Sequence, residues 1–190
     1  MNVYDFDKTI YDGDCTVDFY MYCLKKYPVI YRKIPEVLWF GLLFKIGIVK
    51  KKDFKSRFFK FATLLPDLNG VIRDFWSINK SKIKMFYVKN QREDDVIISA
   101  SPTFILSEIC NILGIKHLYA TNVDLQTGKI IGENCYGEEK VKRFYEAGYA
   151  KDSIDEFYSD SLSDSPLADI SKKAFIVIKD KLIPWVEYKK

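Results

Sequence analysis

Four aspartates crowd into the stretch VYDFDKTIYDGD at positions 3–14. They are Asp5, Asp7, Asp12 and Asp14, and they follow a short apolar run that predicts a strand. Carboxylates this close together repel one another unless water or a cation offsets their charge. Two carboxylates separated by one residue could serve as a nucleophile and a general acid or base, or as ligands of a cation that prefers oxygen.

Other residues able to bind phosphate or a cation close later apolar segments of the chain. They follow the runs DVII and EFYS, and they are Ser99, Ala100, Ser101, Asp160 and Asp164. Lys140 lies at the start of a predicted helix, in YGEEK. In open parallel sheets the ligand crevice lies outside the carboxyl ends of the strands. We therefore expect these residues to meet the N-terminal aspartates at one edge of a sheet.

The spacing of apolar residues separates two kinds of segment. From residue 96 onward strand-like and helix-like runs alternate, which predicts a parallel sheet covered on both faces. Residues 15–88 carry apolar side chains at helical spacing instead. We expect a three-layer α/β core of the Rossmann-like type with a mostly parallel sheet, formed by residues 1–12 and 90–190. An all-helical segment, residues 13–89, would be inserted after the first strand.

Turn-forming residues refine this arrangement. Asp12 with Gly13 predicts a turn into the helical segment, and Thr127 with Gly128 predicts a hairpin. The helix that follows DVIISAS would have Pro102 in its first turn. Ser101 is better placed than Ser99 to cap that helix.

The composition argues against several other chemistries. His117 is the single histidine among 190 residues, and the four cysteines show no CxxC spacing. A zinc site, or a mechanism with a Ser-His or Cys-His pair, would depend on that one histidine. We expect the cysteines to be buried, reduced thiols.

The run DFDKT at positions 5–9 matches the DxDxT signature of the haloacid dehalogenase superfamily of phosphatases. Ser99, Lys140 and the pair Asp160 and Asp164 follow in that family's order, each on the expected kind of element. The chain therefore resembles this superfamily over its whole core. Its helical insertion looks like the cap of the phosphoserine-phosphatase-like branch. Several runs, among them SASP and ENCYGEEK, also resemble the group that includes phosphatidylglycerophosphatases.

The resemblance implies a role for each motif residue. Asp5 would be the nucleophile that forms an aspartyl-phosphate, and Asp7 the general acid and base. Lys140 would place a positive charge beside Asp5 and the phosphate. The phosphate would be bound by Thr9, Ser99, Ala100 and Ser101. Magnesium, which suits oxygen ligands, would be bound by Asp5, Asp7, Asp160 and Asp164.

The substrate pattern departs from that of phosphoserine phosphatases. Asp14 stands roughly where those enzymes carry a longer glutamate for the substrate amine, and glycines that follow their serine motif are absent here. We therefore expect a phosphatase acting on a small-molecule or lipid phosphate. A phosphotransferase or mutase that uses the same aspartyl-phosphate is the alternative.

The helical segment, called the cap below, differs from the core in charge. Residues 13–85 hold 15 Lys+Arg against 6 Asp+Glu, whereas the rest holds 15 against 20. Such a cap could steer an anionic substrate, or lie against an anionic membrane through Trp39 and Phe40, or be a plain bundle with solvated lysines. Nucleic-acid binding is not expected. The apolar run at 37–49 is too short to span a bilayer, and no signal peptide is expected. A cytoplasmic location is predicted, with peripheral membrane contact and the oligomeric state left open.

Overall fold

A six-stranded sheet forms the centre of the molecule in the computed structural model, which describes residues 1–188. The strand order is β3-β2-β1-β4-β5-β6. The first five strands pair in parallel, and β6 (Lys181–Pro184) pairs antiparallel with β5. The parallel strands are β1 (Asn2–Tyr4), β2 (Val96–Pro102), β3 (His117–Thr121), β4 (Glu156–Ser159) and β5 (Lys173–Ile178). The mostly parallel α/β sheet is thus confirmed, and β6 is an edge strand that the sequence did not predict.

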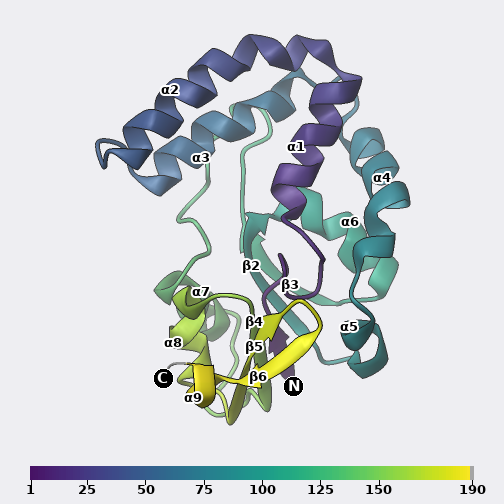
Figure 1. The fold of residues 1–190 in the computed structure, drawn as a ribbon, viewed down its shortest axis with the longest axis vertical. Coiled ribbons are helices and arrows are strands. Elements are labelled where there is room, and N and C mark those ends of the chain that lie inside the picture. The colour runs from purple at the N-terminus through teal and green to yellow at the C-terminus, as the bar shows by residue number, and fades with distance from the viewer. Residues whose placement is uncertain (189–190) are drawn as a thin grey trace.

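Alternate residues of each strand face opposite sides of the sheet, as the pleat requires. Val3 and Phe157 pack in one apolar cluster, whereas their neighbours Tyr4 and Tyr158 pack in a second. The first cluster is covered by α7 (Glu138–Glu146), α8 (Ser165–Ala168) and α9 (Trp185–Tyr188), and the second by α6 (Thr103–Leu113) together with cap helices (Figure 1). The core is therefore a three-layer structure.

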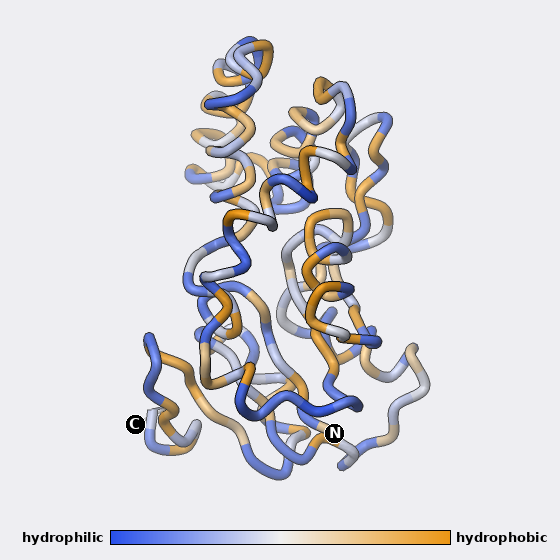
Figure 2. Tube along the Cα trace, turned by 90° about the vertical axis from the view of Figure 1, so that its right-hand side faces the viewer, coloured by the Kyte–Doolittle hydropathy of each residue, from blue (hydrophilic) through white to orange (hydrophobic). Residues whose placement is uncertain are grey.

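The cap helices follow β1 and precede β2. They are α1 (Cys15–Lys26), α2 (Ile34–Lys45), α3 (Lys51–Phe59), α4 (Leu68–Asn79) and α5 (Met85–Asn90), with short 3-10 turns at Pro28–Lys33, Lys60–Leu64 and Lys80–Lys82. Helices α1 and α4 pack against the core, where the Trp76 indole donates to the Ile105 carbonyl at 2.7 Å. Helices α2 and α3 instead form an antiparallel pair that stands away from the sheet (Figures 1 and 2).

Local chemistry explains where several elements begin and end. The Asp14 carboxylate accepts from the Val17 N–H and caps α1, and Gly114 ends α6 in the left-handed conformation. The hairpin predicted around Thr127 and Gly128 is present as a short one: Val123 and Ile130 form an antiparallel bridge, and the Asp124 N–H donates to the Lys129 carbonyl at 2.8 Å. Its turn is closed by the Gly128 N–H, which donates to the Asp124 carbonyl at 2.7 Å.

Two further observations concern the whole described chain. All four cysteines are buried and unpaired, as expected. Within residues 1–188, no helix combines the length and the apolarity needed to cross a membrane.

Candidate active site

A cavity of about 490 Å³ lies at the carboxyl ends of β1, β2 and β4. Nine of the ten predicted site residues line it: Asp5, Asp7, Asp14, Ser99, Ala100, Ser101, Lys140, Asp160 and Asp164. The exception is Thr9, which is fully buried and whose hydroxyl has no hydrogen-bond partner among the described residues. The crevice rule for parallel sheets thus located this group of residues from the sequence.

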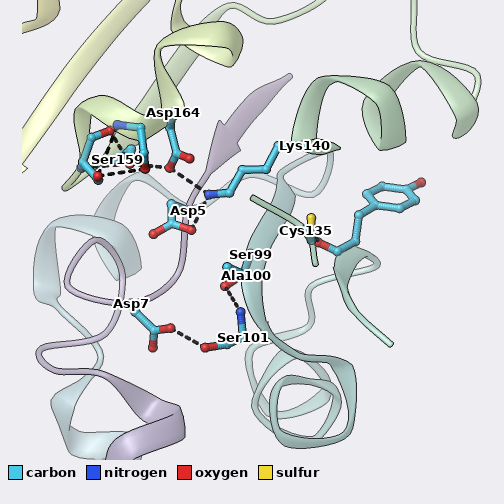
Figure 3. A network of polar contacts seen from close by, with 12 residues as sticks. Asp5, Asp7, Ser99, Ala100, Ser101, Cys135, Lys140, Ser159 and Asp164 are labelled. Atoms are coloured by element: carbon cyan, nitrogen blue, oxygen red, sulfur yellow. Dashed lines mark hydrogen bonds and ion pairs between the residues drawn. The ribbon is translucent and has the colours of Figure 1, made fainter. Parts of the chain in front are cut away.

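Lys140 connects two carboxylates at the floor of the cavity (Figure 3). Its Nζ lies 2.7 Å from Asp5 Oδ1 and 2.7 Å from Asp164 Oδ2. Helix α7 carries the lysine, and only 2% of its side chain is exposed. Burial alone would lower the pKa of Lys140, but the two carboxylates raise it above its ordinary value. The lysine therefore stays charged beside the candidate nucleophile.

Asp5 follows directly after β1 and has little contact with water. Burial is the main reason why the pKa of its carboxyl is raised to about 7. The charges of Asp164 and Asp7 also raise this pKa, whereas the Lys140 ammonium lowers it. Shifts of this kind, with a named charge partner in a cleft, are characteristic of functional sites. The crowding seen in the sequence is therefore a real electrostatic feature of the fold.

Asp7 also lines the cavity, and its carboxylate is held by two donors. Its Oδ1 accepts from the Cys15 N–H at 2.7 Å, and its Oδ2 accepts from the Ser101 hydroxyl. Burial, aided by the charge of Asp14, raises the pKa of Asp7. A carboxyl that keeps a proton more readily than usual suits a general acid. The turn that carries it folds back through two N–H groups that donate to the Phe6 carbonyl.

The C-terminal end of β2 carries two serines that line the cavity with Asp5 and Asp7. Ser99 Oγ accepts from the Ser101 N–H at 3.1 Å, and the sheet register shifts between Ser99 and Pro102. The prediction that Ser101 caps the following helix is wrong, because Pro102 occupies the cap position and no side chain caps it. The Ser101 hydroxyl instead donates to Asp7 and lies 2.8 Å from the Thr16 hydroxyl. This residue therefore positions a carboxylate.

The loop after β4 supplies the remaining acids. Ser159 Oγ donates to Asp164 Oδ2 at 2.7 Å, while Asp164 Oδ1 is buried without a hydrogen-bond partner among residues 1–188. Asp160 also lines the cavity, and burial raises its pKa while the charge of Lys8 opposes the shift. A short 3-10 turn at Leu162–Asp164 fixes the spacing between the two aspartates.

The donor set fits a hard cation such as Mg²⁺. Asp5, Asp160 and Asp164 offer carboxylate oxygens in one cavity that Asp7 also lines, and one Asp164 oxygen is buried without a hydrogen-bond partner among residues 1–188. Residues 1–188 contain no cluster of three or more His, Cys, Asp or Glu side chains spaced to hold one metal ion. Magnesium needs only one or two carboxylates when waters and substrate phosphate complete its shell.

The sequence interpretation missed the residues that the cap contributes. Lys55 Nζ donates to the Ala100 carbonyl at 2.7 Å and to Asn134 Oδ1 at 2.8 Å. Lys51 Nζ lies 3.5 Å from the centre of the Tyr136 ring. Burial, and then the charge of Lys51, lowers the pKa of Lys55 to about 8. The four-residue spacing of Lys51 and Lys55 places both lysines on one side of α3, and this pattern could have indicated a shared contact.

Comparison with known proteins shows the family to which the chain belongs. The family described as haloacid dehalogenase-like hydrolase matches residues 3–169. A probable phosphatase of Mycobacterium tuberculosis (strain H37Rv) is 34% identical over 94 residues, which are 46% of this chain and 33% of that protein. The chain thus aligns with about a third of that curated relative.

Two solved structures share the fold. A protein of unknown function from Bordetella pertussis Tohama I is 18% identical, with a TM-score of 0.73 over 93% of this chain and 88% of that chain. A phosphoserine phosphohydrolase-like protein from Francisella tularensis SCHU S4 is 17% identical, with a TM-score of 0.55 over 95% and 90%. At these identities the likeness concerns the fold.

Proposed function

The chain belongs to the haloacid dehalogenase-like hydrolases, and we propose that it is a phosphatase that cleaves a phosphate monoester through an aspartyl-phosphate on Asp5. One observation carries the proposal: the buried Lys140 ammonium lies 2.7 Å from the Asp5 carboxylate in a cavity that also contains Asp7 and Ser99. A nucleophile, a cation, a protonatable carboxyl and a phosphate-binding turn are the parts that phosphoryl transfer requires.

The first step forms the covalent bond to the enzyme. An Asp5 carboxylate oxygen attacks phosphorus, and the bond between phosphorus and the leaving oxygen breaks. Asp7 gives its proton to that oxygen, so the product leaves as an alcohol. The Ser99 hydroxyl and the backbone at Ala100, at the end of β2, bind the phosphoryl oxygens, and Lys140 offsets their charge.

The second step restores the enzyme. Asp7, now ionised, takes a proton from a water molecule whose oxygen attacks phosphorus. The bond between Asp5 and phosphorus breaks, and inorganic phosphate leaves. Ser101 keeps Asp7 oriented in both steps, because its hydroxyl donates to Asp7 Oδ2.

Asp5, Asp160, Asp164 and the Asp7 carbonyl would hold the magnesium ion. When bound, Mg²⁺ supplies positive charge to the phosphoryl oxygens and orients them. The buried Asp164 oxygen without a hydrogen-bond partner supports this assignment.

The substrate is proposed only at the level of a class, a small-molecule or lipid phosphate. Asp14 caps α1 with its carboxylate while it lines the cavity, which leaves its predicted role as a reader of the substrate untested. The likeness to phosphatidylglycerophosphatases and the cytoplasmic location stay predictions. Transfer to an acceptor remains the alternative to hydrolysis.

Release of p-nitrophenol and phosphate from p-nitrophenyl phosphate tests the proposal. We expect Asp5→Asn to lower the rate at least about a thousandfold, since it removes the nucleophile. EDTA should abolish the rate, and added Mg²⁺ should restore it. Asp12→Asn is the matched control, because Asp12 is exposed in the same loop and does not line the cavity. Full activity of Asp5→Asn would refute the mechanism, and transfer to added alcohols in excess of hydrolysis would favour the alternative.

A further inference from the structure

Helix α2 has two apolar faces, and only one of them is packed. On the inner face the Phe44 ring stacks on Phe54 of α3 at 5.6 Å, and Arg57 lies 4.8 Å from the centre of the Phe40 ring. None of the twelve residues of α2 is buried. A helix that is apolar all round ordinarily lies in a protein core or against lipid. Packing within the chain therefore does not account for the exposed apolar side chains on the second face of α2.

The unpacked side continues past the end of α2 into the turn that leads to α3. Its five residues are each more than half exposed: Leu38 67%, Trp39 60%, Leu42 51%, Ile46 58% and Ile48 69%. We call these five residues the outer cap face. Leu38, Leu42 and Ile46 recur at four-residue spacing and so share one side of the helix. An apolar patch of this kind marks an interaction site.

Positive charge lies next to the outer cap face. Residues 45–60 contain seven Lys and Arg and a single acidic residue, Asp53. Beside the turn, a second cavity of about 730 Å³ shares Ile48 with this face. Its wall carries Lys50, Lys52, Arg57, Lys60 and Lys129.

Some of these cations form ion pairs with carboxylates of the chain, and others feel only the more distant charges of Glu133 and Asp124. Glu36 pairs with Arg57 and Lys60, and Glu133 pairs with Lys52. Lys50 and Lys129 form no ion pair with the carboxylates of residues 1–188. The region therefore keeps positive charge available to an external anion.

We propose that the outer cap face docks onto a bilayer that contains anionic phospholipid. Its apolar side chains enter the interface, and the neighbouring lysines, with Lys45 and Lys50 nearest in sequence, meet the headgroup phosphates. Helix α2 rises only about 18 Å, against roughly 30 Å for the hydrocarbon layer, so it lies in the plane of the surface.

A second copy of the chain is a poorer occupant. A symmetric dimer through this face would bring the same patch from each subunit together, and with it two copies of the same basic stretch. The opposite charge of an anionic bilayer removes this repulsion. The proposal does not depend on the phosphatase activity, because no residue of the outer cap face lines the catalytic cavity.

Trp39 provides a direct readout of docking. The other two tryptophans, Trp76 and Trp185, are buried, so fluorescence that responds to vesicles reports Trp39. With vesicles of 30% phosphatidylglycerol in phosphatidylcholine, we expect a blue shift, protection from acrylamide and sedimentation with the lipid. Vesicles of pure phosphatidylcholine should bind at least tenfold more weakly. Trp39→Phe should still sediment but lose the shift.

Two pairs of variants separate the apolar and the electrostatic contributions. Leu38→Gln with Leu42→Gln, and separately Lys45→Glu with Lys50→Glu, should each weaken binding at least tenfold. The matched apolar control is Ile78→Gln with Val186→Gln, two residues outside the outer cap face that are 63% and 73% exposed. The matched charge control is Lys151→Glu with Lys181→Glu, two exposed lysines outside the cap. The controls should bind like the unaltered chain.

Three results would overturn the proposal. One is the absence of binding to anionic vesicles by the unaltered chain. Another is equal binding by the variants and their controls. The third is a lipid-independent dimer, seen by light scattering and lost in Leu38→Gln with Leu42→Gln, which would assign this face to a second copy. Asp5→Asn should bind vesicles normally, so failure of the enzyme mechanism and failure of docking give distinct results.

Discussion

The catalytic cluster and the outer cap face each reverse the usual distribution of residues. At the cluster, the ionisable side chains of Lys140, Asp5 and Asp164 are almost fully buried. On α2, Leu38 and Trp39 are apolar and mostly exposed. Lysine and aspartate are rarely buried unless paired, and large contiguous exposed apolar patches are rare on monomers.

The two reversals have different energetic consequences. The buried ions need one another, because each would be an uncompensated charge without its partner. The exposed apolar side chains make few contacts with the rest of the chain. Their unfavourable contribution to the free energy is that of apolar surface left in contact with water. Substitutions should therefore disturb the folding of the first region strongly and that of the second weakly.

The largest expected effect comes from removing the charge at the centre of the cluster. Lys140→Met keeps much of the side-chain volume but leaves Asp5 and Asp164 beside each other without a cation. We expect activity to fall at least about a thousandfold and the free energy of unfolding to fall by about 3–5 kcal/mol. Urea unfolding and p-nitrophenyl phosphate kinetics measure the two losses.

Lys142→Met is the matched control for this substitution. It lies on the same helix, with 60% of its side chain exposed, and pairs only loosely with Glu139 and Glu146. Its effect on stability should stay within about 0.5 kcal/mol. Equal losses of activity and stability in the two variants would show that Lys140 matters only for the formation of α7. The contrast between the buried cluster and the outer cap face would then not hold.

A smaller effect is expected at the cap residue that reaches the catalytic cavity. Lys55 should bind substrate anions while charged, and with a pKa of about 8 it is charged at pH 7 and mostly neutral at pH 9. KM should therefore rise as pH increases through 8. Lys55→Gln should raise KM about tenfold at pH 7, because one charged hydrogen bond to the substrate is lost. KM of this variant should no longer increase between pH 7 and 9.

The control for Lys55 lies three residues earlier on the same helix. Lys52 pairs with Glu133 at 2.7 Å and does not line the catalytic cavity. Lys52→Gln should keep both KM and its pH dependence. Steady-state kinetics from pH 7 to 9 at constant ionic strength distinguishes the two variants, and identical profiles would exclude a substrate contact for Lys55.

The sequence predicted which residues line the candidate active site better than it predicted the packing of the cap. Local signals such as DFDKT at a strand end place Asp5 and Asp7, and the order of strands and helices brings Lys140 and Asp164 to the same edge. Roles that depend on distant partners were not readable. Ser101 looked like a helix cap, and only the fold brings its hydroxyl to Asp7, 94 positions away.

The cap shows the same limit for apolar residues. The run at 37–49 predicts a helix, but periodicity cannot say which of its faces finds a partner when nearly every residue is apolar. Lys55 was one basic residue among several in KKKDFKSRFFKF until its contacts with Ala100 and Asn134 were visible. Long-range packing therefore decided the points that the pattern left open.

The smallest expected effect distinguishes an exposed leucine from a buried one. Leu42, in α2, is 51% exposed, whereas Leu106, in α6, is fully buried in the larger apolar cluster. Leu106→Ala should lower the free energy of unfolding by about 2–5 kcal/mol, because it leaves a cavity in a packed core. Leu42→Ala should change it by less than about 0.5 kcal/mol, since that side chain already faces water. Urea unfolding of both variants without lipid makes the comparison. A loss of several kcal/mol in Leu42→Ala would mean that α2 is packed in solution, and the contrast between the two regions would no longer hold.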